Sequence, residues 1–336
     1  MTDRLIMLSR AYTLLAGLYL VTLLALTVAA HVTHKPEIRG VLRTGRALLF
    51  LPAPVLWLPA LALERWTMAL FLLPLAIALI PSWGALLRPR GGGERPARGA
   101  TLTVLTYNLQ APHEEEAPHR AALIREIGAD IVALQELSSE AAAHLASALS
   151  DIYPHQALYP QPNRYAGQGL LSRYPIVTDE FWQCDEIPEP LGHQRAELDV
   201  SGTRVTLYNA HPVPPFSLQE RLRLHPHSVD MTALLERVRT EQGGAVIVAG
   251  DLNMTAQFEE YRRLAEMMVD AYVESGRNGP GFTFPVNPRI PPLARLDHIF
   301  CRGDLLPLEA RPLRHSGGSD HRPVWARLAL TGEENS

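Results

Sequence analysis

Three long uncharged runs in the first 87 residues constrain the fold more than any other feature of the sequence. Residues 11–30 are twenty consecutive uncharged and mostly apolar positions, about the length needed to cross a hydrocarbon core of roughly 30 Å. Residues 66–87 form another such run, with tryptophans near both ends, where interfacial tryptophans are common. Both runs predict membrane spans.

The run between them, residues 47–63, is shorter and contains three prolines. It predicts either a kinked span or a re-entrant segment. We count it as a span, which predicts a membrane anchor over residues 1–87 with spans at about 11–30, 47–63 and 66–87. The expected location is the plasma (inner) membrane, with several passes. A cleaved signal peptide is the competing interpretation of the first run, with Arg4 and Arg10 as its charged start.

Charge separates the chain into two parts. Residues 1–99 contain 11 Lys and Arg against 4 Asp and Glu, and the remainder contains 20 against 31. The resulting −11 disfavours binding to a phosphate backbone, so nucleic acid is not an expected partner. If all three runs span, the positive-inside rule places the second part in the cytoplasm. If the middle run does not cross, the rule leaves its side open.

A basic stretch rich in glycine and arginine, residues 88–99, predicts a linker. From residue 100 to about 329, short apolar runs alternate with segments of helical spacing, which predicts an α/β domain whose sheets are covered by helices. Residues 330–336 are expected to be a disordered tail. The two cysteines, Cys184 and Cys301, do not have zinc-site spacing, and the sequence leaves a single disulfide open.

Polar residues fall at the ends of the predicted strands. Six strand ends deliver carboxylate, amide or imidazole groups, as in a site assembled from loops on a rigid scaffold. The members are Asn108, Glu136, His211, Asp251 with Asn253, Asp297, and Asp320 with His321. Oxygen ligands of this kind suit Mg²⁺, with Mn²⁺ as the alternative, and they predict hydrolysis of a phosphoester or pyrophosphate.

Five short motifs carry a family resemblance. They are Thr106-Tyr107-Asn108, Leu134-Gln135-Glu136, Gly250-Asp251-Leu252-Asn253, Arg295-Leu296-Asp297 and Gly318-Ser319-Asp320-His321. In this order they resemble the motif set of the endonuclease/exonuclease/phosphatase superfamily, over about residues 100–328. The resemblance implies a four-layer α/β sandwich, in which two mainly antiparallel sheets pack together between helices.

The resemblance also implies roles for these residues. Glu136 would be the principal Mg²⁺ ligand, helped by Asn108 and Asp320. Asp251 would position or deprotonate the attacking water, and Asn253 would hold that water in line and bond a phosphate oxygen. His321 would contact the scissile phosphate, with its orientation fixed by Asp297. His211 stands where DNase-I-like and sphingomyelinase-like members carry a second histidine. Arg173 and Arg195 are placed where they could contact phosphate, although a structural salt bridge fits them equally well.

Tethering to a bilayer favours an amphiphilic substrate. The leading hypothesis is therefore a membrane-bound hydrolase of a lipid-linked phosphate, pyrophosphate or phospholipid headgroup. The arrangement of spans followed by this domain resembles bacterial membrane phosphatases associated with glycopeptide resistance. Those act on polyprenyl pyrophosphate carriers. For that assignment the active site should face outward, which conflicts with the charge pattern. The alternatives are a membrane-tethered nuclease and a non-catalytic membrane scaffold. The sequence indicates no protein partner.

Overall fold

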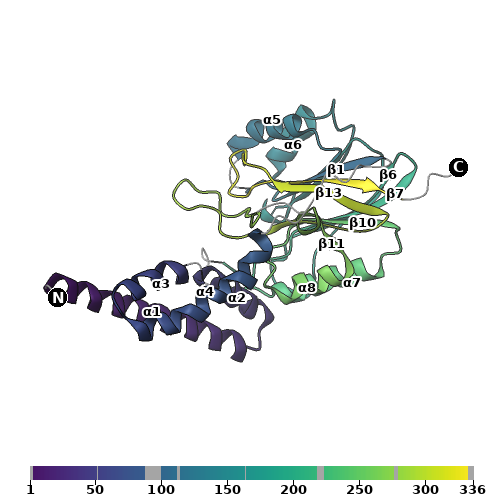
Figure 1. Cartoon of the computed structure of the whole chain (residues 1–336). Coiled ribbons are helices and arrows are strands. Elements are labelled where there is room, and N and C mark those ends of the chain that lie inside the picture. The colour runs from purple at the N-terminus through teal and green to yellow at the C-terminus, as the bar shows by residue number, and fades with distance from the viewer. Residues whose placement is uncertain are drawn as a thin grey trace. The chain divides into compact units, whose positions relative to one another are not determined.

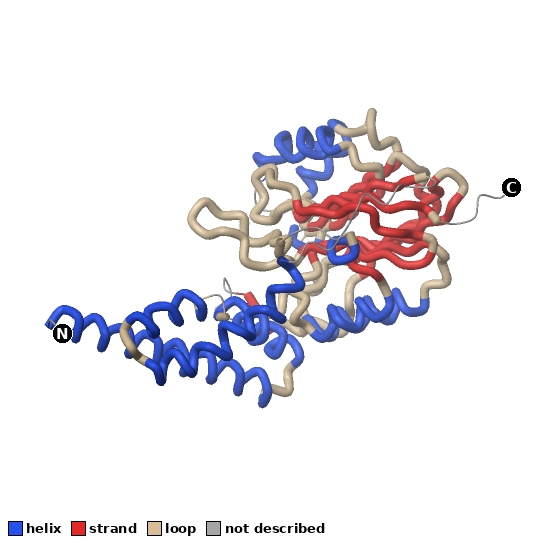
Figure 2. Tube along the Cα trace, viewed as in Figure 1, coloured by secondary structure: helices blue, strands red, loops and turns tan. Residues whose placement is uncertain are grey.

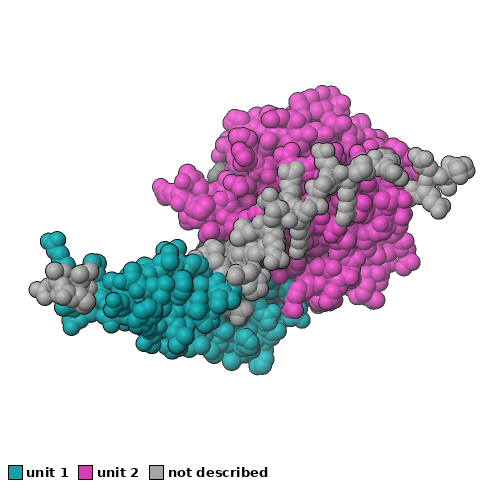
Figure 3. Space-filling view, in the orientation of Figure 1, with its two compact units in different colours: residues 1–88, 257–259 teal, residues 89–256, 260–336 magenta. Residues whose placement is uncertain are grey.

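The computed structural model describes residues 3–50, 52–87, 100–111, 114–162, 164–217, 223–275 and 279–331. The chain divides into two compact units, one of residues 1–88 with 257–259 and the other of residues 89–256 with 260–336 (Figure 3). The predicted linker at 88–99 and most of the predicted tail, residues 332–336, lie outside the described residues.

The first unit is made of helices. They are α1 (Asp3–Val32), α2 (Pro36–Leu49), α3 (Ala53–Ala62) and α4 (Trp66–Leu87) (Figure 2). Aromatic side chains of these helices bond to backbone carbonyls of neighbouring helices. Tyr12 donates to Leu56 O at 2.8 Å and Trp57 donates to Ala69 O at 3.1 Å. These bonds satisfy polar groups within an otherwise apolar bundle.

Large apolar side chains cover the outside of α1. Leu14 is 75% exposed and Leu18 is 66% exposed, and the neighbouring turns expose Leu15, Val21 and Leu24 as well. A continuous exposed apolar surface of this kind is unfavourable in water and favourable in lipid. In the described part of the chain, residues 6–32 of α1 form the one helix that is long and apolar enough to cross a membrane, and a signal sequence near an N-terminus has the same properties.

The three-span prediction is therefore not supported. The middle run is divided between the end of α2 and α3, and Pro52 caps the start of α3. The ten residues of α3 extend only about 15 Å, half of a hydrocarbon core. The run at 66–87 forms the single helix α4, and its crossing of a membrane stays a prediction.

Two six-stranded sheets form the second unit. Sheet A has the order β13-β14-β1-β2-β4-β3 and sheet B the order β11-β12-β10-β7-β6-β5. Each contains one parallel pair, β1 with β2 and β7 with β10, among antiparallel neighbours. The strands of sheet A are β1 (Thr101–Asn108), β2 (Ile131–Gln135), β3 (His155–Tyr159), β4 (Gln168–Ser172), β13 (Leu305–Pro312) and β14 (Val324–Leu330). Those of sheet B are β5 (Ile176–Trp182), β6 (His193–Val200), β7 (Thr203–Ala210), β10 (Ala245–Asp251), β11 (Val269–Asp270) and β12 (Asp297–Gly303). A small hairpin pairs β8 (Phe216–Ser217) with β9 (Arg223–Leu224).

Helices cover both outer faces of the paired sheets (Figure 1). Helices α5 (Ala117–Ile127) and α6 (Ser139–Ala148) pack on sheet A, and α7 (His227–Thr240) and α8 (Glu259–Met267) lie on the side of sheet B. The short α9 (Ala271–Glu274) follows β11. The four-layer sandwich predicted from the sequence is thus confirmed.

Strand side chains alternate between the two faces of each sheet. In β1, Leu102 and Val104 belong to the core between the sheets, and Leu105 and Tyr107 to the core beneath α5 and α6. This alternation follows from the two-residue period of a strand. It explains why the buried runs in the sequence are apolar at nearly every position, since both faces are covered.

Candidate active site

The site forms where the inner faces of both sheets change from apolar to polar. In β1 the inward series Leu102, Val104, Thr106 ends at Asn108, and in β10 the series Ala245, Ile247, Ala249 ends at Asp251. Asp297 begins β12 directly opposite Asp251 in the antiparallel register. Strand alternation therefore aims these polar side chains into one space between the sheets.

A buried amide network joins the sheets just below this space. Gln135 Nε2 donates to Asn209 Oδ1 at 2.7 Å, and Asn209 Nδ2 donates to Leu134 O at 2.9 Å. Both side chains are fully buried. A buried amide left without a partner costs about 1–3 kcal/mol, so this network fixes the spacing of the two sheets under the site.

Asn108 links two of the predicted catalytic carboxylates. Its Nδ2 donates to Glu136 Oε1 and to Asp251 Oδ2, at 3.0 Å each. Its Oδ1 accepts from the backbone N–H of Gln110 at 2.9 Å. The side-chain nitrogen therefore faces the carboxylates, and the ligand role of Asn108, which requires its oxygen, stays a prediction.

Three site residues have left-handed backbone conformations without being glycine. They are Gln110, Glu136 and Asn253, with φ between 50° and 56°. Such conformations are uncommon for residues with a Cβ and are enriched at functional sites. At Glu136 the turn directs the side chain back toward β1, where Oε2 also accepts from the Ala111 N–H at 3.0 Å.

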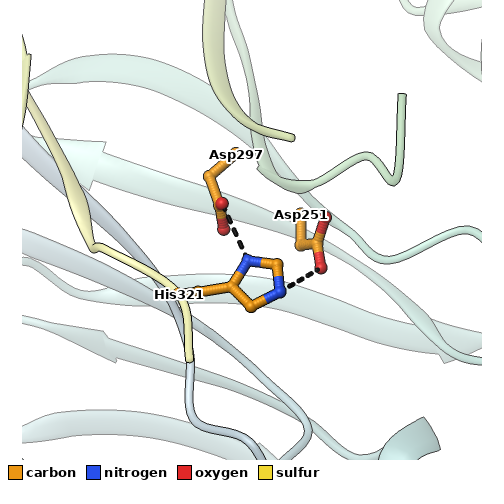
Figure 4. Close-up of side chains that lie close together, drawn as sticks. All are labelled: Asp251, Asp297 and His321. Carbon is orange, nitrogen blue, oxygen red and sulfur yellow. Dashed lines mark hydrogen bonds and ion pairs between the residues drawn. The ribbon is translucent and has the colours of Figure 1, made fainter. Parts of the chain in front are cut away.

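His321 lies between two buried aspartates (Figure 4). Its Nδ1 is 2.9 Å from Asp297 Oδ2, and its Nε2 is 3.6 Å from Asp251 Oδ2. Burial alone lowers the pKa of an imidazole, but these two carboxylates outweigh that effect and raise the pKa of His321 well above its usual value. The two carboxylates therefore favour the protonated ring, whose Nδ1–H donates to Asp297 and whose Nε2–H faces Asp251.

Asp251 remains ionised in the same cluster. Burial raises the pKa of its carboxyl, but the charge of His321 and hydrogen bonds from Asn253 N and Asn108 outweigh burial and leave the pKa below its usual value. The Asn253 N–H bond to Asp251 Oδ1 is 3.0 Å long, and Asn253 Nδ2 donates to Pro212 O at 3.0 Å. This places an anionic acceptor next to a cationic donor.

His211 is the opposite case. Its Nε2 is 3.7 Å from Asp251 Oδ2 and 3.9 Å from Glu136 Oε1. Burial lowers the pKa of His211 to about 4, despite the opposing effect of Asp251. The ring is therefore neutral at pH 7, which leaves one nitrogen as an acceptor and the other as a donor.

Two groups of residues could hold a metal ion. Asp251, Asp297 and His321 offer ligand atoms that all lie within 4.8 Å of one another. A protonated His321, however, has no free lone pair for a metal. Burial raises the pKa of Glu136 to about 7, hydrogen bonds from Asn108 and Ala111 oppose the shift, and the Asp320 carboxylate adds to it.

The surroundings of Glu136 therefore fit a cation better. In the described part of the chain, neither Glu136 nor Asp251 pairs with an arginine, so their charge is balanced only by hydrogen bonds and histidine. Hard oxygen ligands of this kind suit a divalent cation such as Mg²⁺. Glu136, with Asp320 and Asn108 nearby, would hold such an ion.

The structure does not bring Arg173 and Arg195 to the site, which corrects their assignment as phosphate contacts. Arg173 donates to Gly128 O at 2.9 Å and lies near Asp130. Arg195 pairs with Glu197 and Glu241 at 2.7 Å each. Both arginines have structural roles.

Sequence reasoning missed a supporting layer behind His211. Asp230 accepts from His193 Nε2 and from the Val213 N–H, at 2.9 Å each, and His227 Nδ1 lies 2.7 Å from Val213 O. These buried groups hold the segment that begins with His211 and Pro212. No local motif marks them, because their partners are distant in sequence. Gln110 was missed too, and its Oε1 accepts from the Asp320 N–H at 2.9 Å.

Gly250 shows how tightly the strands pack beside Asp251. A Cβ at Gly250 would lie 1.9 Å from Ala210 O, on the strand that leads to His211. We expect Gly250→Ala to push β7 and β10 apart, at a cost of about 2–3 kcal/mol. The melting temperature should fall by about 5–10 °C. Gly243→Ala is the control, because the atom nearest to its Cβ would be the Thr206 hydroxyl oxygen at 3.1 Å, and the next would be a Val246 methyl carbon at 3.7 Å. Equal melting temperatures for the two variants would contradict this account.

Comparisons with known proteins agree with this geometry. The model of the endonuclease/exonuclease/phosphatase family matches residues 105–321. An endonuclease/exonuclease/phosphatase from Bacteroides vulgatus is 19% identical, with a TM-score of 0.55 over 69% of this chain and 99% of that one. The corresponding protein from Beutenbergia cavernae is 21% identical, with a TM-score of 0.55 over 69% of this chain and 72% of that one.

Truncated Caenorhabditis elegans TDP2 is 18% identical, with a TM-score of 0.56 over 69% of this chain and 99% of that one. At these identities the likeness establishes the fold. A comparison with curated protein sequences found no match. Members of the matched family are hydrolases that act on phosphoester bonds and commonly use divalent metal ions. The matched region covers most of the chain and contains Asn108, Glu136, Asp251, Asp297 and His321, and the chain belongs to the endonuclease/exonuclease/phosphatase family.

Proposed function

We propose that this protein is a membrane-associated, Mg²⁺-dependent phosphoesterase that hydrolyses a lipid-linked phosphate or pyrophosphate. The observation that carries the catalytic part is the pairing of an ionised Asp251 with a protonated His321 across 3.6 Å. The metal, when bound at Glu136, supplies charge neutralisation and orientation of the phosphate.

Four residues of the chain have separate roles in the proposed reaction. Asp251, whose low pKa keeps it ionised, accepts a hydrogen bond from the attacking water, orients it and takes its proton as the water attacks phosphorus. His321 donates from a ring nitrogen to a phosphate oxygen, where negative charge develops in the transition state. Asp297 fixes the orientation of that ring through Nδ1. Neutral His211 can donate a hydrogen bond from Nε2 on the side of Glu136 and Asp251, because carboxylate oxygens accept.

The exposed apolar surface of α1 supports a lipid-linked substrate. A catalytic unit joined to a bilayer meets amphiphilic phosphates at high local concentration. The −11 charge of residues 100–336 opposes a polyanionic nucleic acid. A nuclease is the second candidate, because the matched family also contains endonucleases and exonucleases.

The proposal is tested with the purified full-length protein in Mg²⁺. The substrates are a polyprenyl pyrophosphate, sphingomyelin and plasmid DNA, and Asp251→Ala and His321→Ala are the inactive controls. We expect phosphate release from the polyprenyl substrate, loss of that release in both variants and intact DNA. Nicked DNA without product from either lipid would replace the proposal by the nuclease. Equal behaviour of wild type and both variants would favour a scaffold.

A further inference from the structure

A second cavity lies in the catalytic unit, apart from the catalytic side chains. Its volume is about 870 Å³, and it is lined by α5, residues 279–282, the end of β13 and the start of β14. None of its described lining residues belongs to the Asp251, Asp297 and His321 cluster. Its size is within the range of small-molecule sites.

The charge of this cavity is opposite to that of its domain. Arg311, Arg314, His315 and Arg322 line it, and among the described lining residues Glu126 is the one carboxylate. Residues 100–336 as a whole carry 20 Lys and Arg against 31 Asp and Glu. Guanidinium groups gathered with few carboxylates repel one another, and an anion between them removes that repulsion.

The arginines are incompletely paired. Arg322 Nε is buried and has no hydrogen-bond partner in the described part of the chain. Arg311 is 3.6 Å from Glu309 and lies over the Trp325 ring, with 5.3 Å between the guanidinium carbon and the ring centroid. A guanidinium held on an aromatic face keeps its N–H edge free for a phosphate. The cavity therefore combines one arginine that has an unpartnered nitrogen, Arg322, with a guanidinium held on an aromatic ring, Arg311.

Apolar side chains complete the wall. Phe282, Leu123 and Trp325 line the same cavity as the arginines. A purely inorganic anion gains nothing from such surfaces, whereas a ligand with both a phosphate and an apolar part contacts both. The cavity thus has both a basic part and an apolar part, as a site for a phosphorylated amphiphile requires.

Backbone hydrogen bonds link one lining residue of the cavity to the segments of the active site. Arg322 directly follows His321, and its N–H donates to Thr283 O at 2.9 Å. The Thr283 hydroxyl accepts from the Leu296 N–H at 3.0 Å, next to Asp297. Arg322 is therefore linked through Thr283 to the segment that carries Asp297 and lies next to the catalytic histidine.

We propose that this cavity is a second anion site, distinct from the catalytic cluster, that binds a phosphate-bearing amphiphile. The arginines hold the phosphate, and the aromatic wall contacts the adjoining apolar part. This goes beyond the proposed function, because binding here involves no hydrolysis and uses no residue of the catalytic cluster. The shared chemistry is a phosphate group with terminal anionic oxygens, supplied by the phosphate monoester of a lipid headgroup or by free phosphate.

The test uses the full-length protein in phosphatidylcholine nanodiscs with EDTA, which removes metal from the catalytic site. One arm adds inorganic phosphate, and the other replaces part of the lipid with phosphatidic acid. Tryptophan fluorescence reports binding, and Trp325→Phe identifies the signal from the cavity. The variant is Arg311→Ala with Arg314→Ala. Its control is Arg204→Ala with Arg239→Ala, which removes the same charge from exposed positions outside the cavity.

We expect a saturable Trp325 signal that the control retains, and a rise in the dissociation constant of at least about tenfold in the Arg311 and Arg314 variant. A signal with phosphatidic acid alone identifies a lipid headgroup, and a signal with both additions identifies phosphate itself. Hydrolysis of a small soluble phosphodiester should change less than about twofold in either variant. No Trp325 signal in either arm, or equal binding by the variant and the control, would overturn the proposal. Failure of the lipid hydrolysis assay alone would not affect it.

Discussion

Replacement of Asp251 by Asn is expected to lower kcat by about a thousandfold at saturating Mg²⁺, within the range found for loss of a proton-accepting group. The amide keeps the size of the carboxyl but loses its charge. One orientation of the amide would place its NH₂ group where Asp251 Oδ2 now accepts from Asn108 Nδ2 and faces His321 Nε2, and the other would place it where Oδ1 accepts from the Asn253 N–H. Either orientation of the amide leaves the attacking water without an anionic acceptor.

The measurement is kcat with the best substrate from the panel, together with the melting temperature. Asp304→Asn is the matched control, because Asp304 is exposed and follows the opposite end of β12 from Asp297. We expect the control to retain wild-type kcat within about twofold. A kcat for Asp251→Asn within tenfold of wild type, with normal melting, would remove Asp251 from the water-orienting role.

The sequence was sufficient to predict the sandwich and most of the site. Buried strands leave uninterrupted apolar runs, and the inward polar residue that ends each run, such as Asn108 or Asp251, marks where the strand reaches the site. The pattern is local and has a two-residue period. It can therefore be recognised in the sequence without knowing which strands pair.

The alternation of side chains along a strand also predicts which way Arg195 points, and this prediction excludes it from the site. Its neighbours Gln194 and Ala196 are fully buried, and Ala196 belongs to the core between the sheets. Alternation therefore turns Arg195 to the other face, where it meets Glu241. For Arg195, the face of the strand from which the side chain projects predicts its contacts better than its position in the sequence near the motifs.

Other features depend on contacts that a single sequence does not display. Asp230 supports the His211 segment from α7, and its partner His193 is 37 positions away. The middle apolar run illustrates a different limit. Its composition suited a span, but the chain leaves the helix between Leu49 and Ala53, where Pro52 lacks an N–H to continue the ladder. A hydropathy pattern shows that a segment is apolar, but it does not show whether that segment forms one unbroken helix.

Metal affinity is expected to increase with pH through about 7. Burial raises the pKa of Glu136 from 4.5 to about 7, so below that pH the metal-free carboxyl is mostly protonated. A metal ion binds the carboxylate, and each pH unit below the pKa therefore costs about tenfold in apparent affinity. Above the pKa the affinity should level off. Titration of activity with Mg²⁺ at several pH values between about 5.5 and 8.5 measures this dependence.

Glu136→Gln isolates the contribution of this carboxyl. The amide preserves shape and can still accept from Ala111 N, but it carries no charge and does not titrate. We expect the Mg²⁺ concentration for half-maximal activity to rise at least about 100-fold and its dependence on pH near 7 to disappear. Glu140→Gln, at an exposed position of α6, should leave both properties unchanged.

The two outcomes of this substitution carry different information. If the Mg²⁺ requirement rises but its pH dependence persists, another group, such as Asp320, titrates during metal binding. If the requirement does not rise, the ion is held away from Glu136, and the cluster of Asp251, Asp297 and His321 becomes the remaining candidate. In that case His321 would have to lose its proton before binding metal. Affinity would then follow the high pKa of His321 instead of the pKa of Glu136.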